Sequence, residues 1–216
     1  MEVEITATKV YDIGESIIAS GFPMTTSYDA DLFEDSSRWL QYLINHDFPS
    51  AQTHEDAEDQ IKRARKLASN PADSGHGNFL KGIRVSMNVT GPIKWWIEAQ
   101  RYSHFDIVSS QSTMHRGIRF NLRNMLPRGF PDDLIKLLEG YQAAVVRGEL
   151  TAQEFVKMLP TALEYTGRVS TNYMQLKIMY QQRKNHALKE WHIFCDWCSG
   201  LPLPDLITGG EWTTPP

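Results

Sequence analysis

The stretch that most constrains the fold is residues 79–90, FLKGIRVSMNVT, because apolar and polar residues alternate along it. This alternation is typical of a strand with one buried face. The apolar residues that share this face are Ile83, Val85, Met87 and Val89. Gly91 breaks the strand, and Pro92 is favoured in a first helical turn. We therefore expect a strand that passes directly into a helix.

Helical spacing and capping residues predict most of the other elements. Residues 2–11 alternate like a second strand. The predicted helices are 29–46, one that begins at Thr53 or His54, 131–147, 152–164 with a Thr151–Glu154 capping box, and 171–198 with an interruption near Asn185. The expected fold class is α+β: one mostly helical domain over residues 1–216, with a small mixed or antiparallel sheet and an irregular tail from about residue 200.

Composition excludes several classes of protein. The 216 residues suffice for one large domain or two small ones. A net charge of −4 argues against nucleic-acid binding. The sequence has no run of about 18 apolar residues, so we expect no membrane span. The acidic N-terminus does not resemble a signal peptide. The two cysteines provide no disulfide framework, so we expect a cytoplasmic protein.

Cys195 and Cys198 form a C-x-x-C motif three residues after His192. Zinc normally takes four ligands, and the chain has no second cysteine pair. A redox C-x-x-C belongs at a helix N-terminus, whereas this one closes a predicted helix. We expect both cysteines to serve packing and no metal to be bound, with a zinc site as the alternative.

Trp95 and Trp96 follow the predicted strand–helix turn. Large aromatic residues fill cores and subunit interfaces, and they also form walls for flat ligands. We expect packing here, with the ligand wall as the alternative.

Residues 101–116, RYSHFDIVSSQSTMHR, are too polar for a core strand. They lie past the end of the helix predicted after Pro92. Arginine forks and hydroxyl groups are the donors that a phosphate or carboxylate requires. Arg101, Arg116 and the serine run therefore indicate an anion-binding loop, and the alternative is a solvated loop whose serines cap the next turn.

The order and spacing of several motifs resemble the flavin-dependent thymidylate synthases, over most of the chain. That family has a Gly-His loop, a strand, a Pro-Ile helix start and then an arginine, as in Gly75-His76, Pro92-Ile93 and Arg101. Its C-terminal motifs resemble LPTALEYTGR with Arg168, then Asn172, Leu176, Arg183 and His186-Ala187. Extra residues fall near 28–55.

The signature of the family differs here at several positions. Its R-H-R is Arg101-Tyr102-Ser103, and its S-x-R-Y element resembles Ser112–His115 without the arginine, unless Arg116 replaces it. The histidine after the Gly-His loop is Gly82, and Met174 stands in place of the C-terminal arginine.

The resemblance implies a fold, an activity and partners. The family is a homotetramer that binds FAD between subunits, and it moves a methylene group from methylenetetrahydrofolate to C5 of dUMP. Flavin reduced by NADPH supplies the hydride. We expect the same reaction or a related C5 modification of a pyrimidine nucleotide. The alternative is an altered or inactive relative that binds nucleotides as an oligomer.

The resemblance also implies roles for individual residues. Arg183 would stabilise negative charge on the pyrimidine, as a permanently protonated group can. The residues expected to hold the nucleotide are Arg101, Ser112, Arg116, Arg168 and Arg183. The residues expected to contact flavin are His76, Ser86, His104, Asn172 and His186.

Overall fold

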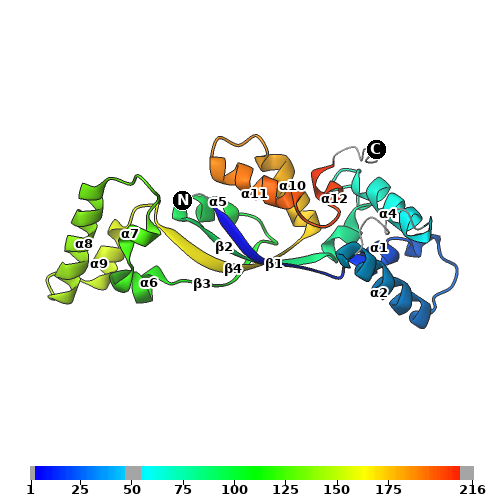
Figure 1. Cartoon of the computed structure of the whole chain (residues 1–216), viewed down its shortest axis with the longest axis horizontal. Helices are drawn as coiled ribbons and strands as arrows, with labels where there is room; N and C mark the ends of the chain where they lie inside the picture. Colours follow the sequence, from blue (N-terminus) through cyan, green and yellow to red (C-terminus); the bar gives the residue numbers. More distant parts are fainter. Residues whose placement is uncertain (1–2, 47–54, 210–216) are drawn as a thin grey trace. The chain divides into compact units, whose positions relative to one another are not determined.

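Four strands form one sheet in the order β1-β2-β4-β3 (Figure 1). The structure is a computed structural model that describes residues 3–46 and 55–209. The strands are β1 (Glu4–Tyr11), β2 (Arg84–Pro92), β3 (Asp106–Ser110) and β4 (Glu164–Asn172). The sheet is antiparallel, and with the many helices it confirms the predicted α+β class.

The register of β2 against β4 is fixed by bonds along their length. Thr90 Oγ1 and Thr166 Oγ1 are 2.7 Å apart, so these residues face each other. Two residues further along, Arg168 Nη1 donates to Asn88 Oδ1 at 3.1 Å. Each step backwards on β2 therefore matches a step forwards on β4, as antiparallel pairing requires.

The chain divides into two compact units. Unit 1 comprises Met1–Ala7 and Met87–Val169, and unit 2 comprises Thr8–Ser86 and Ser170–Pro216. Strands β1, β2 and β4 each contribute residues to both units. The expectation of one domain over residues 1–216 stays a prediction.

Unit 1 carries α5 (Ile93–Ala99) directly after β2, and a group of helices after β3 (Figure 1). These helices are α6 (Thr113–Arg116), η3 (Gly117–Arg119), α7 (Leu122–Met125), α8 (Asp132–Val146) and α9 (Ala152–Met158). Their shared core is Leu122, Leu126, Ile135, Leu138, Phe155 and Leu163. The predicted capping box is present, because Glu154 N donates to Thr151 Oγ1 and Thr151 N to Glu154 Oε2.

Unit 2 contains the remaining helices of the described residues. They are α1 (Ile13–Ala19), η1 (Phe22–Met24), α2 (Ala30–His46), α4 (Glu55–Ala68), η2 (Asn78–Lys81), α10 (Tyr173–Arg183), α11 (Lys189–Ser199) and α12 (Asp205–Thr208). Helix α4 buries Ala57, Ile61, Ala64 and Ala68, which recur at helical spacing. Arg65 of α4 pairs with Asp205, which attaches α12 to α4.

Two predicted helices need correction. The helix expected over 152–164 ends at Met158, and Glu164–Asn172 is strand β4 rather than the start of a helix. Residues 106–110, expected in a loop, form β3, which is mostly exposed.

The other predicted elements agree with the structure or lie beyond it. The helices over 29–46 and 131–147 are confirmed, as is the interruption near Asn185. Thr53 and His54, expected to open a helix, lie outside the described residues. The tail expected to be irregular contains α12.

Candidate nucleotide and flavin site

The residues predicted for nucleotide and flavin fall into two equal sets. Unit 1 holds Arg101, His104, Ser112, Arg116 and Arg168. Unit 2 holds His76, Ser86, Asn172, Arg183 and His186.

Within unit 2, Asn172 starts helix α10. Its backbone is extended, and its Oδ1 accepts a hydrogen bond from Gln175 N at 2.9 Å, which makes it an N-cap. Ser86 lies half-buried on β2. The first N–H of α10, on Tyr173, donates to Ile83 O at 3.0 Å, so the helix start is fixed to the residue before β2.

Arg183 and His186 meet on the indole ring of Trp191. The guanidinium carbon of Arg183 lies 4.5 Å from the ring centroid, a cation–π distance. The His186 ring meets the same indole edge-on, with centroids 6.2 Å apart. Helix α10 ends at Arg183, at the interruption predicted near Asn185, and His186 lies in the turn that follows. Its N–H bonds to Arg183 O at 2.9 Å.

The tautomer of His186 follows from its partners. Leu188 N donates to His186 Nδ1 at 3.1 Å, so Nδ1 accepts and the neutral ring carries its proton on Nε2. His192 donates from Nε2 to His186 O at 2.7 Å, which fixes the backbone of the turn. The turn therefore presents a held guanidinium beside an Nε2–H donor. Trp191 was missed from the sequence, although an aromatic residue five positions after His186 was a usable signal.

His76 lies on the rim of a cavity of about 410 Å³ in unit 2. The cavity is lined by Ser16, Ala19, Ser20, Pro23, Leu67, Gly75, His76, Asn78, Phe79 and Gly82. Gly75 has φ +79°, a conformation that side chains rarely adopt. Hydroxyl, amide and imidazole groups around one phenyl ring suit one end of a large polar aromatic cofactor.

Two departures from the family pattern pack around this loop. A Cβ on Gly77 would lie 3.3 Å from Met174 Cε, so buried Met174 rests against the His76 loop. A Cβ on Gly82 would lie 2.5 Å from Ser16 Oγ. The family's histidine at position 82 would therefore require Ser16 to move.

Within unit 1, the donor-rich segment 101–116 is anchored at its far end. Gln111 N donates to Thr166 O at 3.0 Å, and Thr166 N donates to Gln111 Oε1 at 2.9 Å. Ser112 caps α6 by accepting from His115 N at 3.2 Å. The side chains of Arg101, His104 and Arg116 are exposed.

The side chain of Arg168 forms hydrogen bonds within the part of the sheet that belongs to unit 1. Besides Asn88, its Nη1 donates to Ala7 O at 3.2 Å, so one side chain links β4, β2 and β1. Ala7 has φ +50°, an unusual value for alanine within a strand. The half-buried guanidinium therefore has a structural role, and its contact with a nucleotide stays a prediction.

The Trp95–Trp96 pair is core, and the alternative of a ligand wall is wrong. Their exposed fractions are 0% and 1%. The Trp96 ring stacks on Tyr165 with centroids 5.2 Å apart, and its Nε1 donates to Tyr165 O. Gly167 allows this approach, since a Cβ there would lie 3.0 Å from Trp96.

The cysteines also serve packing. Cys195 and Cys198 are free and buried on α11. Burial raises the pKa of the Cys195 thiol to about 11 and that of Cys198 well above its usual value. No grouping of three metal-ligating side chains occurs in the described ranges, 3–46 and 55–209. The zinc alternative therefore finds no support there.

None of the helices in the described residues is both long and apolar enough to cross a membrane.

The chain shares its fold with solved nucleotide enzymes. No protein-family model matches it, and no curated protein matches its sequence. Thymidylate synthase X (ThyX) from Helicobacter pylori, crystallised with FAD and dUMP, superposes with a TM-score of 0.61 at 15% identity, over 96% of this chain and 97% of that one. The UMP/dUMP methylase PolB from Streptomyces cacaoi, bound to 5-Br dUMP, gives 0.58 at 14% identity, over 96% and 94%. At these identities the likeness establishes the fold.

Proposed function

We propose that the protein is a flavin-dependent transferase that modifies C5 of a pyrimidine nucleotide, either converting dUMP to dTMP or making a related C5 change. The observation that carries the proposal is the placement of Arg183 and His186 on Trp191, in a fold shared with ThyX and with PolB. Because PolB is a UMP/dUMP methylase, the proposal includes a substrate other than dUMP.

Arg183 is the proposed catalytic residue. Nucleophilic attack by C5 requires electron density to build up on the pyrimidine ring, and a nearby guanidinium stabilises that charge at any working pH. The Trp191 ring holds the guanidinium in one orientation before substrate arrives. His186 Nε2–H provides a neutral donor beside it.

The cofactor proposed is FAD, with NADPH and methylenetetrahydrofolate as co-substrates. When bound, the reduced flavin supplies the hydride. The His76 cavity fits part of such a cofactor, because it offers polar donors around the Phe79 ring. The residues proposed to contact it are His76, Ser86, His104, Asn172 and His186. A homotetramer in the cytoplasm completes the proposal.

Arg101 and Arg116 are the proposed phosphate ligands. Both guanidinium groups are exposed, and charge-assisted bonds from arginine suit a phosphate. Ser112 and Arg168 already cap α6 and bridge strands. We therefore propose that these two support the nucleotide chiefly by fixing the loop and the sheet.

A flavin titration tests the proposal most directly. The purified protein should show a flavin spectrum, or gain one with FAD, and dUMP or UMP should perturb it. Release of tritium from nucleotide labelled at C5 would then report turnover. Arg183→Ala should reduce turnover by about 10²–10³-fold while flavin stays bound. Lys184→Ala, at the exposed neighbouring position, is the matched control. A protein that takes up no flavin would overturn the proposal.

The second candidate is a nucleotide-binding relative without flavin chemistry. Two positions favour this candidate. The flavin-dependent thymidylate synthases carry an arginine where this chain has Met174, and a histidine where it has Gly82, against which Ser16 lies. This candidate predicts that dUMP raises the melting temperature of a colourless protein. Arg101→Ala should abolish that shift, and Arg128→Ala, at an exposed site in the α7–α8 loop, should preserve it.

A further inference from the structure

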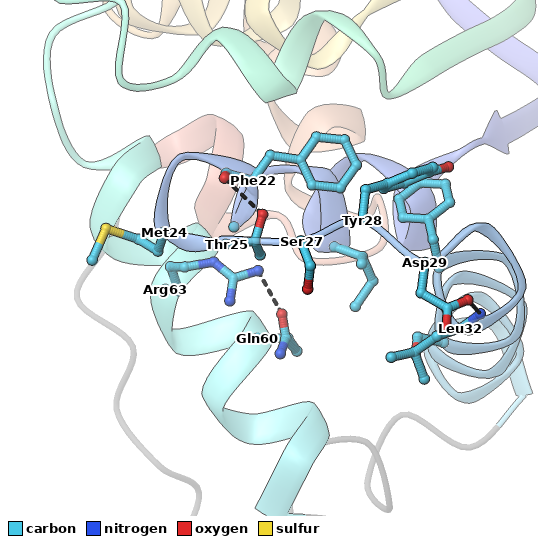
Figure 2. Close-up of a pocket in the computed structure, with 13 residues that line it drawn as sticks. Phe22, Met24, Thr25, Ser27, Tyr28, Asp29, Leu32, Gln60 and Arg63 are labelled. Atoms are coloured by element: carbon cyan, nitrogen blue, oxygen red, sulfur yellow. Dashed lines mark hydrogen bonds between the residues drawn. The ribbon is translucent and has the colours of Figure 1, made fainter.

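A second cavity, of about 330 Å³, lies in unit 2 (Figure 2). Its walls come from the end of α1, from η1, from the start of α2 and from α4. η1 separates it from the His76 cavity, because Phe22 and Met24 line the one and Pro23 the other. This is therefore a site distinct from the proposed flavin site.

An aromatic cluster forms one wall of the cavity. Phe22 meets Tyr28 edge-on with ring centroids 5.8 Å apart, and Phe33 lies 5.4 Å from Phe22 and 6.1 Å from Tyr28. Tyr28 and Leu32 stay 67% and 66% exposed. Apolar side chains held in contact yet open to solvent are what an aromatic ligand would cover.

The opposite wall carries Arg63 in a fixed position. Its Nε donates to Ser20 Oγ at 3.2 Å, and its Nη2 donates to Ile17 O at 2.9 Å and to Gln60 Oε1. A Cβ on Gly21 would lie 3.0 Å from Arg63 Cζ, so the guanidinium rests flat against the Gly21 backbone. The charge is therefore preorganised, which reduces the entropy lost on binding.

Arg63 retains donors for a ligand. A guanidinium has five N–H groups, and the three bonds above use those of Nε and Nη2. Among the described residues, Nη1 has no acceptor and Arg63 has no carboxylate partner. Desolvation lowers the pKa of this half-buried group, as expected for a cation without a counter-charge.

Acidic groups limit the charge of the ligand. Figure 2 shows Asp29 and Leu32 across the cavity from Arg63 and Gln60. Asp29 Oδ1 accepts from Leu32 N at 3.1 Å, which keeps the carboxylate at the rim. A neighbouring cavity that shares Ile18, Ser36 and Gln60 is lined by Asp35 and Asp56. A second anionic group on the ligand would meet these carboxylates, so a dianion such as a nucleotide phosphate is disfavoured.

We propose that this cavity binds a small aromatic monocarboxylate, with its carboxylate on Arg63 Nη1 and its ring against Phe22, Tyr28 and Leu32. One fixed cation selects one anionic group, and the aromatic cluster selects a flat apolar body.

Binding of 2-naphthylacetate tests the proposal, with its neutral amide, 2-naphthylacetamide, as the matched ligand. Calorimetry on the full chain, without flavin or nucleotide, should give saturable binding of the acid and an affinity about tenfold or more lower for the amide. Equal affinities would overturn the role of Arg63. No binding of the acid up to about 1 mM would overturn the site itself.

Substitutions test the contributions of the two cavity walls to binding separately. Arg63→Met should remove the preference for the acid over the amide. Tyr28→Ala, at the exposed rim, should weaken both ligands while their ratio persists, which tests the site even if Arg63→Met fails to fold. Arg38→Met is the control, because Arg38 is exposed on α2 and pairs with Glu34 and Asp35. If Arg38→Met lowered the ratio as Arg63→Met does, surface charge would explain the preference and the proposal would fail. Since no flavin is present, the result is independent of the proposed function.

Discussion

Two strands of the described residues pass into a helix with no residue between, and both junctions follow one plan. β2 passes directly into α5, the first junction, and β4 passes directly into α10, the second. At the first junction, Ile93 N donates to Leu163 O at 2.9 Å. At the second, Tyr173 N donates to Ile83 O at 3.0 Å. In both cases the first residue of the helix bonds to the residue that precedes the other strand.

The side chains at the two junctions differ in kind. Helix α5 has no side-chain cap and buries Trp95 and Trp96. Helix α10 is capped by Asn172, buries Lys177 and ends at Arg183. One backbone plan thus supports two apolar cores, but the helix in unit 2 buries a lysine beside Tyr173, Leu176 and Met179 and ends at an arginine held on an indole ring. The proposed catalytic arginine, Arg183, lies at the other end of the helix that the second junction begins.

The largest expected effect tests the apolar first junction. Trp96→Ala should lower the free energy of unfolding by about 3–5 kcal/mol, because a fully buried indole is removed from beside Tyr165 and Gly167. Urea unfolding followed by circular dichroism measures it. Ile97→Ala, at a 52% exposed position on the same helix, should change it far less. Similar losses for both variants would mean that α5 does not depend on its buried face.

A smaller loss is expected from the buried cation of the second junction. Lys177 is 2% exposed and donates from Nζ to Ala68 O and Asn70 O at the end of α4. Lys177→Met keeps the stem but leaves two carbonyl groups unbonded, which should cost about 1–3 kcal/mol in the same urea experiment. Lys184→Met, at an exposed position just after α10, is the control. If Lys177→Met left the free energy of unfolding unchanged, these carbonyl groups would be bonded to water instead.

The difference between the junctions also explains what the sequence predicted. β2 was predicted because its buried positions are apolar, including Val85, Met87 and Val89. β4 was missed because its buried positions are Glu164, Gly167, Val169 and Thr171, so its burial alternates while its hydrophobicity does not. β3 was missed because it is an exposed strand at the edge of the sheet, rich in serine.

The candidate site was also predicted from the sequence only in part. Motif spacing identified Arg183 and His186 as candidate site residues, and the turn after α10 places them on one indole ring. Spacing did not reveal that Arg168 bridges strands or that Ser16 lies against Gly82. Those contacts join residues far apart in sequence, and only the packed structure defines them.

Asn172, the N-cap of α10, should contribute less to the stability of the protein than the buried Lys177. Asn172→Ala removes the acceptor for Gln175 N, and the loss of an N-cap costs about 1 kcal/mol. Asn172→Ser retains an acceptor and should recover most of that stability in thermal unfolding. If serine is no better than alanine, the cap does not stabilise α10, and the proposed contact of Asn172 with flavin becomes its main role.

The smallest effect is a difference in alkaline stability between the buried tyrosine of unit 1 and the buried cysteines of unit 2. Burial raises the pKa of Tyr165, at the first junction, to about 12, and that of Cys195, on α11 of unit 2, to about 11. Unfolded thiols titrate near about 8.5 and tyrosine near about 10. Between these values and the folded ones the native state binds more protons than the unfolded state, so stability falls as pH rises. Cys195→Ala/Cys198→Ala should flatten the decline from about pH 9 to 11, and Tyr165→Phe only the decline above about pH 10. Urea midpoints measured across this range would contradict the assignment if Tyr165→Phe flattened the decline below about pH 10.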